Sequence, residues 1–204
     1  MPSATFWGWT AGIIVLTAFV PYTRSIKAGK TKLARSTWLI WIVVSLLLLK
    51  SYDEVGGKDA IWLSWAYLAA VIWTATLSRK YGKGGWERLD RFCFAGTGVA
   101  LSLWVASGSA AVGLFATLLV DAFGATGTVV KTWRHPEEED SLTWCMTFTA
   151  NLVNLLAVPS WDWLHGTYPI YMTAMTGTIA ALSLRKFHKK SRSACGFRAK
   201  YPAK

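Results

Sequence analysis

The sequence contains few of the residues that bind metal ions or form disulfides. Its 204 residues include 3 Cys and 3 His, and neither set has the spacing of a zinc site. No pair of His residues stands at helical spacing, and the chain has no Gly-rich phosphate loop and no set that pairs a nucleophile with a base. We therefore expect no metal ion, no cofactor and no enzymatic activity.

Acidic residues are also scarce, and the basic residues follow a pattern. The chain has 11 Asp and Glu against 22 Lys and Arg, a net charge of +11. All the basic residues except Lys50 and Lys58 lie in alternate gaps between apolar segments or in the C-terminal region. A nucleic-acid-binding surface gathers its charge in one patch, whereas membrane proteins carry Lys and Arg in their cytoplasmic loops. The pattern indicates a membrane protein and argues against a nucleic-acid partner.

Seven apolar segments are long enough to be membrane spans with help from flanking residues. A hydrocarbon core of ~30 Å takes about 20 helical residues, and these segments have roughly 14 to 20. They cover residues 6–22, 36–49, 60–78, 92–109, 111–130, 142–160 and 166–184. Because the basic gaps follow the odd-numbered segments, we expect an all-α integral protein of the plasma (inner) membrane, with its N-terminus outside and its C-terminus in the cytoplasm.

Tryptophan is unusually abundant, with 13 residues. Most of them fall near the ends of the apolar segments, as in the aromatic belts at the two surfaces of a membrane. Trp41, Trp73 and Trp104 lie deeper in their segments. These three side chains either pack between helices or form a wall on which a ligand stacks.

The sequence repeats itself on either side of the fourth segment. Residues 16–27 (LTAFVPYTRSIK) align with residues 120–131 (VDAFGATGTVVK). Further matches pair Thr37-Trp38 with Thr143-Trp144, Ala75 with Ala181, and Arg79-Lys80 with Arg185-Lys186. The alignment predicts a duplicated unit of three helices.

The predicted division of the chain follows from this repeat. The first three-helix unit covers residues 1–80, a linker helix covers 81–110, the second unit covers 111–186, and a basic cytoplasmic tail covers 187–204. Because each unit has an odd number of helices, the linker helix is needed to give both units the same orientation. The tail either is solvated or binds anionic lipid headgroups.

This 3+1+3 plan, with a Pro at the inner end of the first helix and a basic loop leading to a Ser/Thr-Trp helix start, resembles the SWEET and PQ-loop transporter superfamily. The Pro-Gln pair of that superfamily is replaced by Pro21-Tyr22 in the first copy and by Ala125-Thr126, between Gly124 and Gly127, in the second. The resemblance implies alternating access, with hinges at Pro21, Gly124 and Gly127. Both Pro and Gly allow a helix to bend.

Asp121 is the acidic residue that we place at the middle of an apolar segment. An Asp at the centre of a membrane helix costs about 2.5 to 3.5 kcal/mol on the insertion scale, so we expect it to face the interior of the bundle. Thr147, Asn151 and Asn154 lie on one face of the sixth segment. We predict that these four residues line a substrate-binding site.

Four hydroxyl groups complete the predicted substrate-binding site. The repeat alignment places Thr17 at the position of Asp121 and Ser45 at the position of Asn151, so the first copy carries weaker polar groups. Thr173 and Thr176 on the seventh segment either close the wall of the site or, with Gly177, form a seam of small residues between helices.

The leading interpretation is a secondary carrier or facilitator of a small polar solute, with protons as candidate coupling ions through Asp121. The alternative is a non-transporting seven-helix receptor or an accessory subunit of a larger membrane complex. In that case the same polar residues only hold helices together. Besides the lipid bilayer and the solute, we expect a partner to be a second copy or a larger membrane complex.

The acidic run at residues 137–140 precedes the sixth segment on its cytoplasmic side. Its negative charge complements the positive end of a helix, which predicts a helix cap. The alternative is that these carboxylates pair with the basic first loop when a gate closes on the cytoplasmic side.

The topology predicts which loops an impermeant thiol reagent reaches in intact cells. In a variant whose three natural Cys are replaced by Ser, we expect labelling of a cysteine introduced between residues 107 and 110, and no labelling of Gly84→Cys. Labelling of Gly84→Cys in sealed, correctly oriented cells would contradict the predicted orientation, and with it the parallel arrangement of the repeats.

Overall fold

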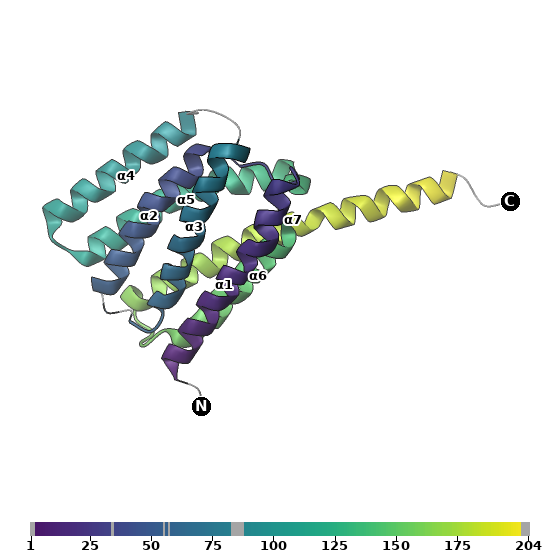
Figure 1. The fold of residues 1–204 in the computed structure, drawn as a ribbon. Helices are drawn as coiled ribbons and strands as arrows, with labels where there is room; N and C mark the ends of the chain where they lie inside the picture. Colours follow the sequence, from purple (N-terminus) through teal and green to yellow (C-terminus); the bar gives the residue numbers. More distant parts are fainter. Residues whose placement is uncertain (1–2, 34, 55, 57, 83–87, 201–204) are drawn as a thin grey trace.

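The chain is all α-helical, as predicted. The structure, a computed structural model, describes residues 3–33, 35–54, 56, 58–82 and 88–200, and these form seven α-helices and two 3₁₀ turns with no strand among them (Figure 1). The helices are α1 (Ala4–Lys27), α2 (Arg35–Glu54), α3 (Ile61–Tyr81), α4 (Arg88–Ser107), α5 (Ala110–Arg134), α6 (Ser141–Asn154) and α7 (Trp163–Lys200). The turns η1 (Pro136–Glu138) and η2 (Leu155–Ala157) flank α6.

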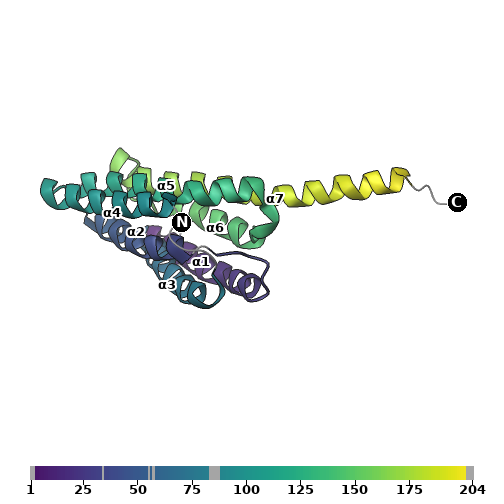
Figure 2. The same ribbon diagram turned by 90° about the horizontal axis from the view of Figure 1, so that it is seen from above.

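Each of the seven helices differs in length from its predicted segment: α6 is shorter and the other six are longer. The sixth segment was expected to continue to residue 160, but α6 ends at Asn154 and the chain passes through η2. In contrast, α7 continues to Lys200 and includes most of the predicted tail, because residues 185–200 are rich in Lys and Arg and the next Pro is Pro202. This extension projects away from the bundle (Figures 1 and 2).

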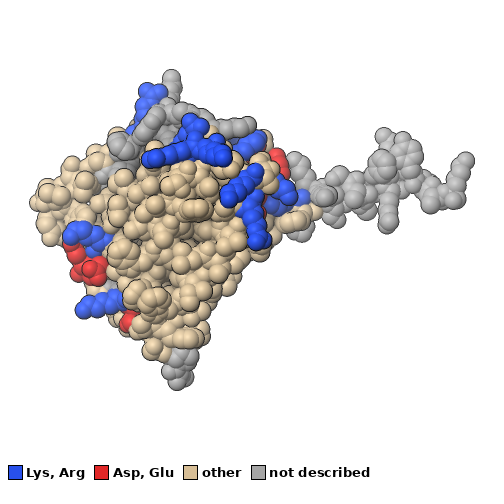
Figure 3. Space-filling view, in the orientation of Figure 1, with Lys and Arg blue, Asp and Glu red and all other residues tan. Residues whose placement is uncertain are grey.

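Three of the described helices are long and apolar enough to cross a membrane. They are α1, α3 and residues 111–134 of α5. Each carries basic residues in its last turn: Arg24 and Lys27, Arg79 and Lys80, Lys131 and Arg134. Figure 3 shows Lys and Arg gathered at one end of the bundle, with a smaller mixed group of charges at the other. The three apolar helices therefore run in the same direction.

The helices pack in two groups that lie on opposite sides of the bundle (Figure 2). Helix α3 packs against α1 and α2, and α7 packs against α5 and α6. The groups meet where α1 contacts α6 and where α2 contacts α5, whereas α4 lies outside against α5 and α2. If α1, α2 and α3 are replaced by α5, α6 and α7 in that order, and the reverse, the set of main contacts stays the same. Two three-helix units related by a two-fold axis would have this packing, and the repeat itself stays a prediction.

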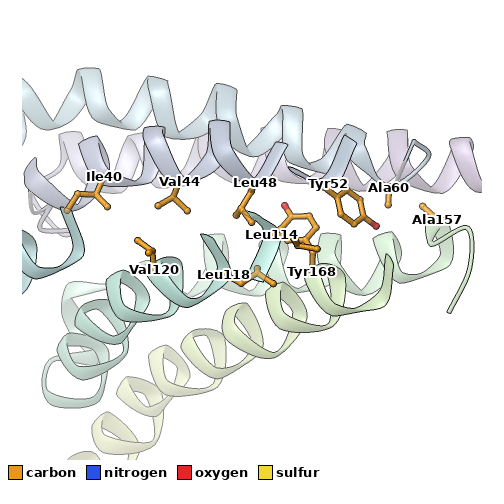
Figure 4. Close-up of a cluster of buried hydrophobic side chains, with 10 residues drawn as sticks. All are labelled: Ile40, Val44, Leu48, Tyr52, Ala60, Leu114, Leu118, Val120, Ala157 and Tyr168. Carbon is orange, nitrogen blue, oxygen red and sulfur yellow. The ribbon is translucent and has the colours of Figure 1, made fainter. Parts of the chain in front are cut away.

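Large apolar side chains fill the contact between α2 and α5. Ile40, Val44, Leu48 and Tyr52 follow one another at intervals of four residues, so they form one face of α2. Figure 4 shows this row opposite a row on α5 that ends at Leu114. The numbering increases along α2 as it decreases along α5, so these two helices are antiparallel. Tyr168 joins the cluster from α7.

Small side chains fill the equivalent contact among α1, α3 and α6. That cluster contains Ala11, Ala66, Ala70 and Ala150 besides two larger aliphatic residues. Small residues allow helix backbones to approach closely, which is how helices associate in a membrane without a hydrophobic driving force. At the outer end of α1, a Cβ atom added to Gly8 would overlap the carbonyl oxygen of Asp59.

We predict that Gly8→Ala destabilises the bundle by about 1 to 3 kcal/mol, because the added methyl group forces α1 away from the chain before α3. Gly98→Ala is the matched control, since Gly98 lies within α4 and a Cβ there meets nothing within 4 Å. Thermal unfolding in detergent should show a lower Tm for Gly8→Ala and an unchanged or slightly higher Tm for Gly98→Ala. Equal Tm values for the two variants would contradict the close contact.

Candidate functional site

A cavity of about 90 Å³ lies among six helices at the centre of the bundle. Its described lining comes from α1, α2 and α3 on one side and from α5, α6 and α7 on the other. The polar lining residues are Ser45, Ser64, Asp121, Thr143, Thr147 and Thr176, and the aromatic ones are Phe19, Tyr22, Trp38, Trp41, Tyr67, Trp144 and Tyr168. The site is therefore shared between the two predicted repeats.

An unbroken series of rings forms one wall of the cavity. The ring of Phe19 lies 5.7 Å from that of Tyr22, which lies 5.9 Å from Trp38, and Trp38 lies 4.9 Å from Trp41 in an edge-to-face arrangement. The Nε1 atom of Trp41 is buried and has no hydrogen-bond partner among the described residues. We call these four side chains the aromatic wall.

Asp121 on α5 lines the cavity and supplies its carboxylate. The hydroxyl of Tyr171, from α7, donates a hydrogen bond of 2.6 Å to this carboxylate. Among the residues that the structure describes, no Lys, Arg or His forms an ion pair with Asp121. The cavity thus holds an acidic group with one neutral hydrogen-bond donor.

Asn151 lies behind the lining and connects three helices. It is 1% exposed, and its amide donates to the hydroxyl of Tyr67 at 2.6 Å and to the carbonyl oxygen of Thr147 at 2.8 Å. A longer contact of 3.4 Å reaches Thr176 on α7. Asn151 therefore holds the ring of Tyr67 in the cavity wall and lies behind the lining residues Tyr67 and Thr176.

Asn154 and Thr17 do not line the cavity. Asn154 is fully buried at the end of α6, and its amide has no hydrogen-bond partner among the described residues. Thr17 is exposed on the outside of α1, and its hydroxyl donates to the carbonyl oxygens of Ile13 and Ile14. The structure therefore does not bring these two residues to the cavity, and their membership of a solute site stays a prediction.

The misplacement of Thr17 has a simple geometric cause. The interior residues Ala11, Val15, Ala18 and Tyr22 of α1 match Leu114, Leu118, Asp121 and Ala125 of α5, one residue out of step with the sequence alignment. One residue turns a helix by about 100°, which moves a side chain to another face. The α1 residues that line the cavity are Phe19 and Tyr22, so α1 contributes rings there and no carboxylate.

The remaining predicted site residues divide into two groups. Ser45, Thr147 and Thr176 line the cavity. Thr173 is not in the lining, and its hydroxyl donates to the carbonyl oxygen of Pro169. A Cβ atom at Gly177 would come within 2.8 Å of the Phe148 ring, so this part of α7 is a seam against α6.

The predicted hinge residues lie within continuous helices. Pro21 stands inside α1, and Gly124 and Gly127 stand inside α5. Gly124 has a packing role, because a Cβ atom there would lie 3.3 Å from Nε1 of Trp41. Bending at these three positions stays a prediction.

Apart from Thr176, the residues of α7 that line the cavity were not predicted from the sequence. The lining face of α7 carries Tyr168, Met172, Met175, Thr176 and Ile179, spaced i, i+4, i+7, i+8 and i+11. This is the spacing of one helical face. Tyr168 and Tyr171 stand three residues apart on α7, on either side of Pro169. This aromatic pair was the feature of the sequence that could have indicated the face.

A network of charged groups lies at the end of the bundle where α1, α3 and α5 finish. Glu139 is buried, pairs with Lys131 of α5 and accepts a hydrogen bond of 3.0 Å from Nε1 of Trp144. Lys186 of α7 donates to the carbonyl oxygen of Glu139 at 2.8 Å. Glu139 thus connects the ends of α5, α6 and α7.

The acidic run has both of the roles considered for it. Asp140 is the N-cap of α6 and accepts a bond of 2.8 Å from the backbone N–H of Thr143. Glu138 pairs with Lys32 of the basic first loop. The hydroxyl of Thr143 also donates to the carbonyl oxygen of Ala18, 3.2 Å away on α1. The two helix groups are therefore joined at this end of the cavity.

Hydrogen bonds join the two groups at the opposite end as well. The hydroxyl of Ser64 donates to that of Tyr168 at 2.9 Å, and the hydroxyl of Tyr52 donates to the carbonyl oxygen of His165 at 3.1 Å. Just before α7, hydrogen bonds from the Ser160 hydroxyl and from His165 hold the pKa of Asp162 well below its ordinary value. Asp162 therefore stays ionised and caps the start of α7.

Comparison of this chain with profiles of known protein families, with curated proteins and with solved structures finds no match.

The burial of Glu139 predicts a large effect of its removal. In Glu139→Ala the partly buried ammonium of Lys131 and the indole N–H of Trp144 lose their shared acceptor. We expect the free energy of unfolding to fall by about 3 kcal/mol. This value is at the lower end of the range for a broken buried ion pair, because Lys131 keeps some contact with solvent. Glu54→Ala is the control, since it breaks an exposed pair with Lys50 and should cost about 0.3 to 0.5 kcal/mol. Similar unfolding free energies for both variants would contradict a network centred on Glu139.

Proposed function

We propose that this chain is a seven-span protein of the plasma membrane that carries a small polar solute by alternating access. The observation that supports the proposal best is the central cavity, lined by α1, α2, α3, α5, α6 and α7 around the carboxylate of Asp121. A solute site at the interface of two parallel helical repeats is the general plan of such carriers.

The direction of the three apolar helices supports seven spans. Since α1, α3 and α5 end with basic residues at the same end of the bundle, the chain must return to the other end before α3 and again before α5. Helices α2 and α4 make these returns. The pair α6 and α7 then repeats the course of α2 and α3 and packs as they do. Placing the basic end in the cytoplasm puts the N-terminus outside.

The closure of both ends supports a carrier with two gates. On the proposed cytoplasmic side the Lys32–Glu138 pair and the Thr143 hydroxyl join the two helix groups. On the proposed outer side the bonds from Ser64 and Tyr52 do so. An exposed ion pair contributes about 0 to 1 kcal/mol and a neutral hydrogen bond about 0.5 to 1.5 kcal/mol. Either set is weak enough to open while the other stays closed.

If protons drive the carrier, Asp121→Asn should remove the coupling. Asparagine keeps the size of the side chain and can still bond to the Tyr171 hydroxyl, but it cannot exchange a proton. Protein in liposomes that contain a pH-sensitive dye would be screened against sugars, amino acids, organic acids and amines. We expect solute-dependent proton flux in the natural protein, at least tenfold lower flux in Asp121→Asn, and unchanged flux in Asp53→Asn, whose carboxylate is exposed.

A second variant separates solute affinity from coupling. Asn151→Ala releases the ring of Tyr67 from the cavity wall, so KM should rise several-fold while pH-driven accumulation remains. Uptake by Asp121→Asn equal to that of the natural protein would leave an uncoupled facilitator. Solute binding without any flux would favour the receptor or accessory subunit.

A further inference from the structure

The chemistry of the cavity points to one class of solute. We infer that the cavity binds a small organic ammonium cation that also carries an oxygen acceptor. This inference rests on the proposed function, because it concerns the same site. Asp121 and the aromatic wall would hold the ammonium group, and the indole N–H of Trp41 would donate to the oxygen.

The charge of the cavity favours a cation. Asp121 has no basic partner among the described residues and receives a hydrogen bond from the neutral Tyr171. A carboxylate away from water is strongly disfavoured unless it is paired or protonated. A solute with one positive charge would neutralise Asp121, whereas an anionic solute would add to the repulsion.

The aromatic wall favours an organic cation over a metal ion. Ammonium groups are attracted to the faces of Trp, Tyr and Phe rings within about 6 Å, and quaternary ammonium compounds are recognised by such rings. Na⁺, K⁺ and Mg²⁺ instead require several oxygen ligands. The cavity presents one carboxylate among seven aromatic and two Met side chains, which suits a cation covered with methyl or methylene groups.

Three hydroxyl donors of the cavity lining are already committed to bonds within the protein. The Thr147 hydroxyl donates to the carbonyl oxygen of Trp144, the Thr176 hydroxyl to that of Met172, and the Ser64 hydroxyl to Tyr168. These three groups cannot also donate to a solute, and each sugar hydroxyl left without a partner would cost about 1 to 3 kcal/mol.

The indole of Trp41 is a buried donor whose N–H has no partner within the described residues. Its Nε1 atom lies beside Gly124. Gly124 follows Asp121 by three residues, a rise of roughly 4.5 Å along α5. A solute with an oxygen two or three bonds from its ammonium nitrogen can therefore reach both groups. The volume of about 90 Å³ is far below the ~300 to 1,000 Å³ of drug-sized sites, so the solute is small.

The decisive experiment compares ligands of matched shape. Binding to the detergent-solubilised full chain would be measured by thermal shift and tryptophan fluorescence. The ligands are choline, its uncharged carbon analogue 3,3-dimethyl-1-butanol, tetramethylammonium and glucose. We expect choline to bind at least tenfold more tightly than the carbon analogue, because only the ammonium pairs with Asp121. Tetramethylammonium should bind about threefold to tenfold more weakly than choline, because it lacks the acceptor for Trp41.

Two variants test the separate contacts. Trp41→Phe keeps an aromatic ring and removes the N–H. The affinity of this variant for choline should therefore fall to its affinity for tetramethylammonium, and its affinity for tetramethylammonium should change by no more than about threefold. Asp121→Asn should remove the preference for choline over its carbon analogue. Trp161→Phe and Asp53→Asn are matched controls outside the cavity and should behave as the natural chain does. The comparison of the two ligands in Trp41→Phe stands even if Asp121→Asn fails to fold.

The outcomes separate this inference from the proposed function. Equal binding of choline and its carbon analogue, or stabilisation by glucose with none by either ammonium compound, would overturn the inference, and so would an absence of binding by all four. Choline binding without choline flux into liposomes would leave the inference intact and overturn the carrier. Flux of a neutral solute without binding of an ammonium compound would support the carrier and overturn the inference.

Discussion

A lipid bilayer offers no hydrogen bonds, so the polar side chains of a membrane bundle have to be satisfied by one another or by something that enters the bundle. Most polar groups near the cavity meet this constraint inside the protein, as Asn151 does with Tyr67 and as the threonine hydroxyls do with their own helices. At the cavity itself, Asp121 has one neutral donor and no basic partner, and the indole N–H of Trp41 has no partner among the described residues. Both residues line the space that six helices enclose, and their incomplete pairing is a physical reason to expect a solute there.

The two helix groups achieve the same packing with different side chains. Alanine and glycine let α1, α3 and α6 approach closely, whereas branched and aromatic residues fill the contact of α2 with α5 and α7. In a duplicated architecture this asymmetry gives the two sides of the cavity different chemistry. The aromatic wall comes from α1 and α2, and the carboxylate comes from α5. Neither helix group contains both parts of the proposed cation site.

The all-α fold and the order of the helices could be predicted from the sequence, because apolar length and charge placement are strong signals over whole segments. The position of Asp121 in the interior could also be predicted, from its cost in lipid. Thr17 could not be placed, since a shift of one residue in a weak alignment changes the face of a helix. The partners of Asn151 and the exclusion of Asn154 from the cavity depend on where α6 ends and on rings contributed by other helices, which local sequence does not specify.

The location of the two proposed ligand contacts has a consequence for gating. A solute shifts a conformational equilibrium only by the difference between its affinities for the two states. Asp121 belongs to α5 and Trp41 to α2, so a cation that holds both would bridge the two helix groups and stabilise the closed arrangement. The polar bonds at either end are individually weak. Bridging at the centre would therefore leave either end free to open first, and the gradient of the solute or of protons would then decide the direction of transport.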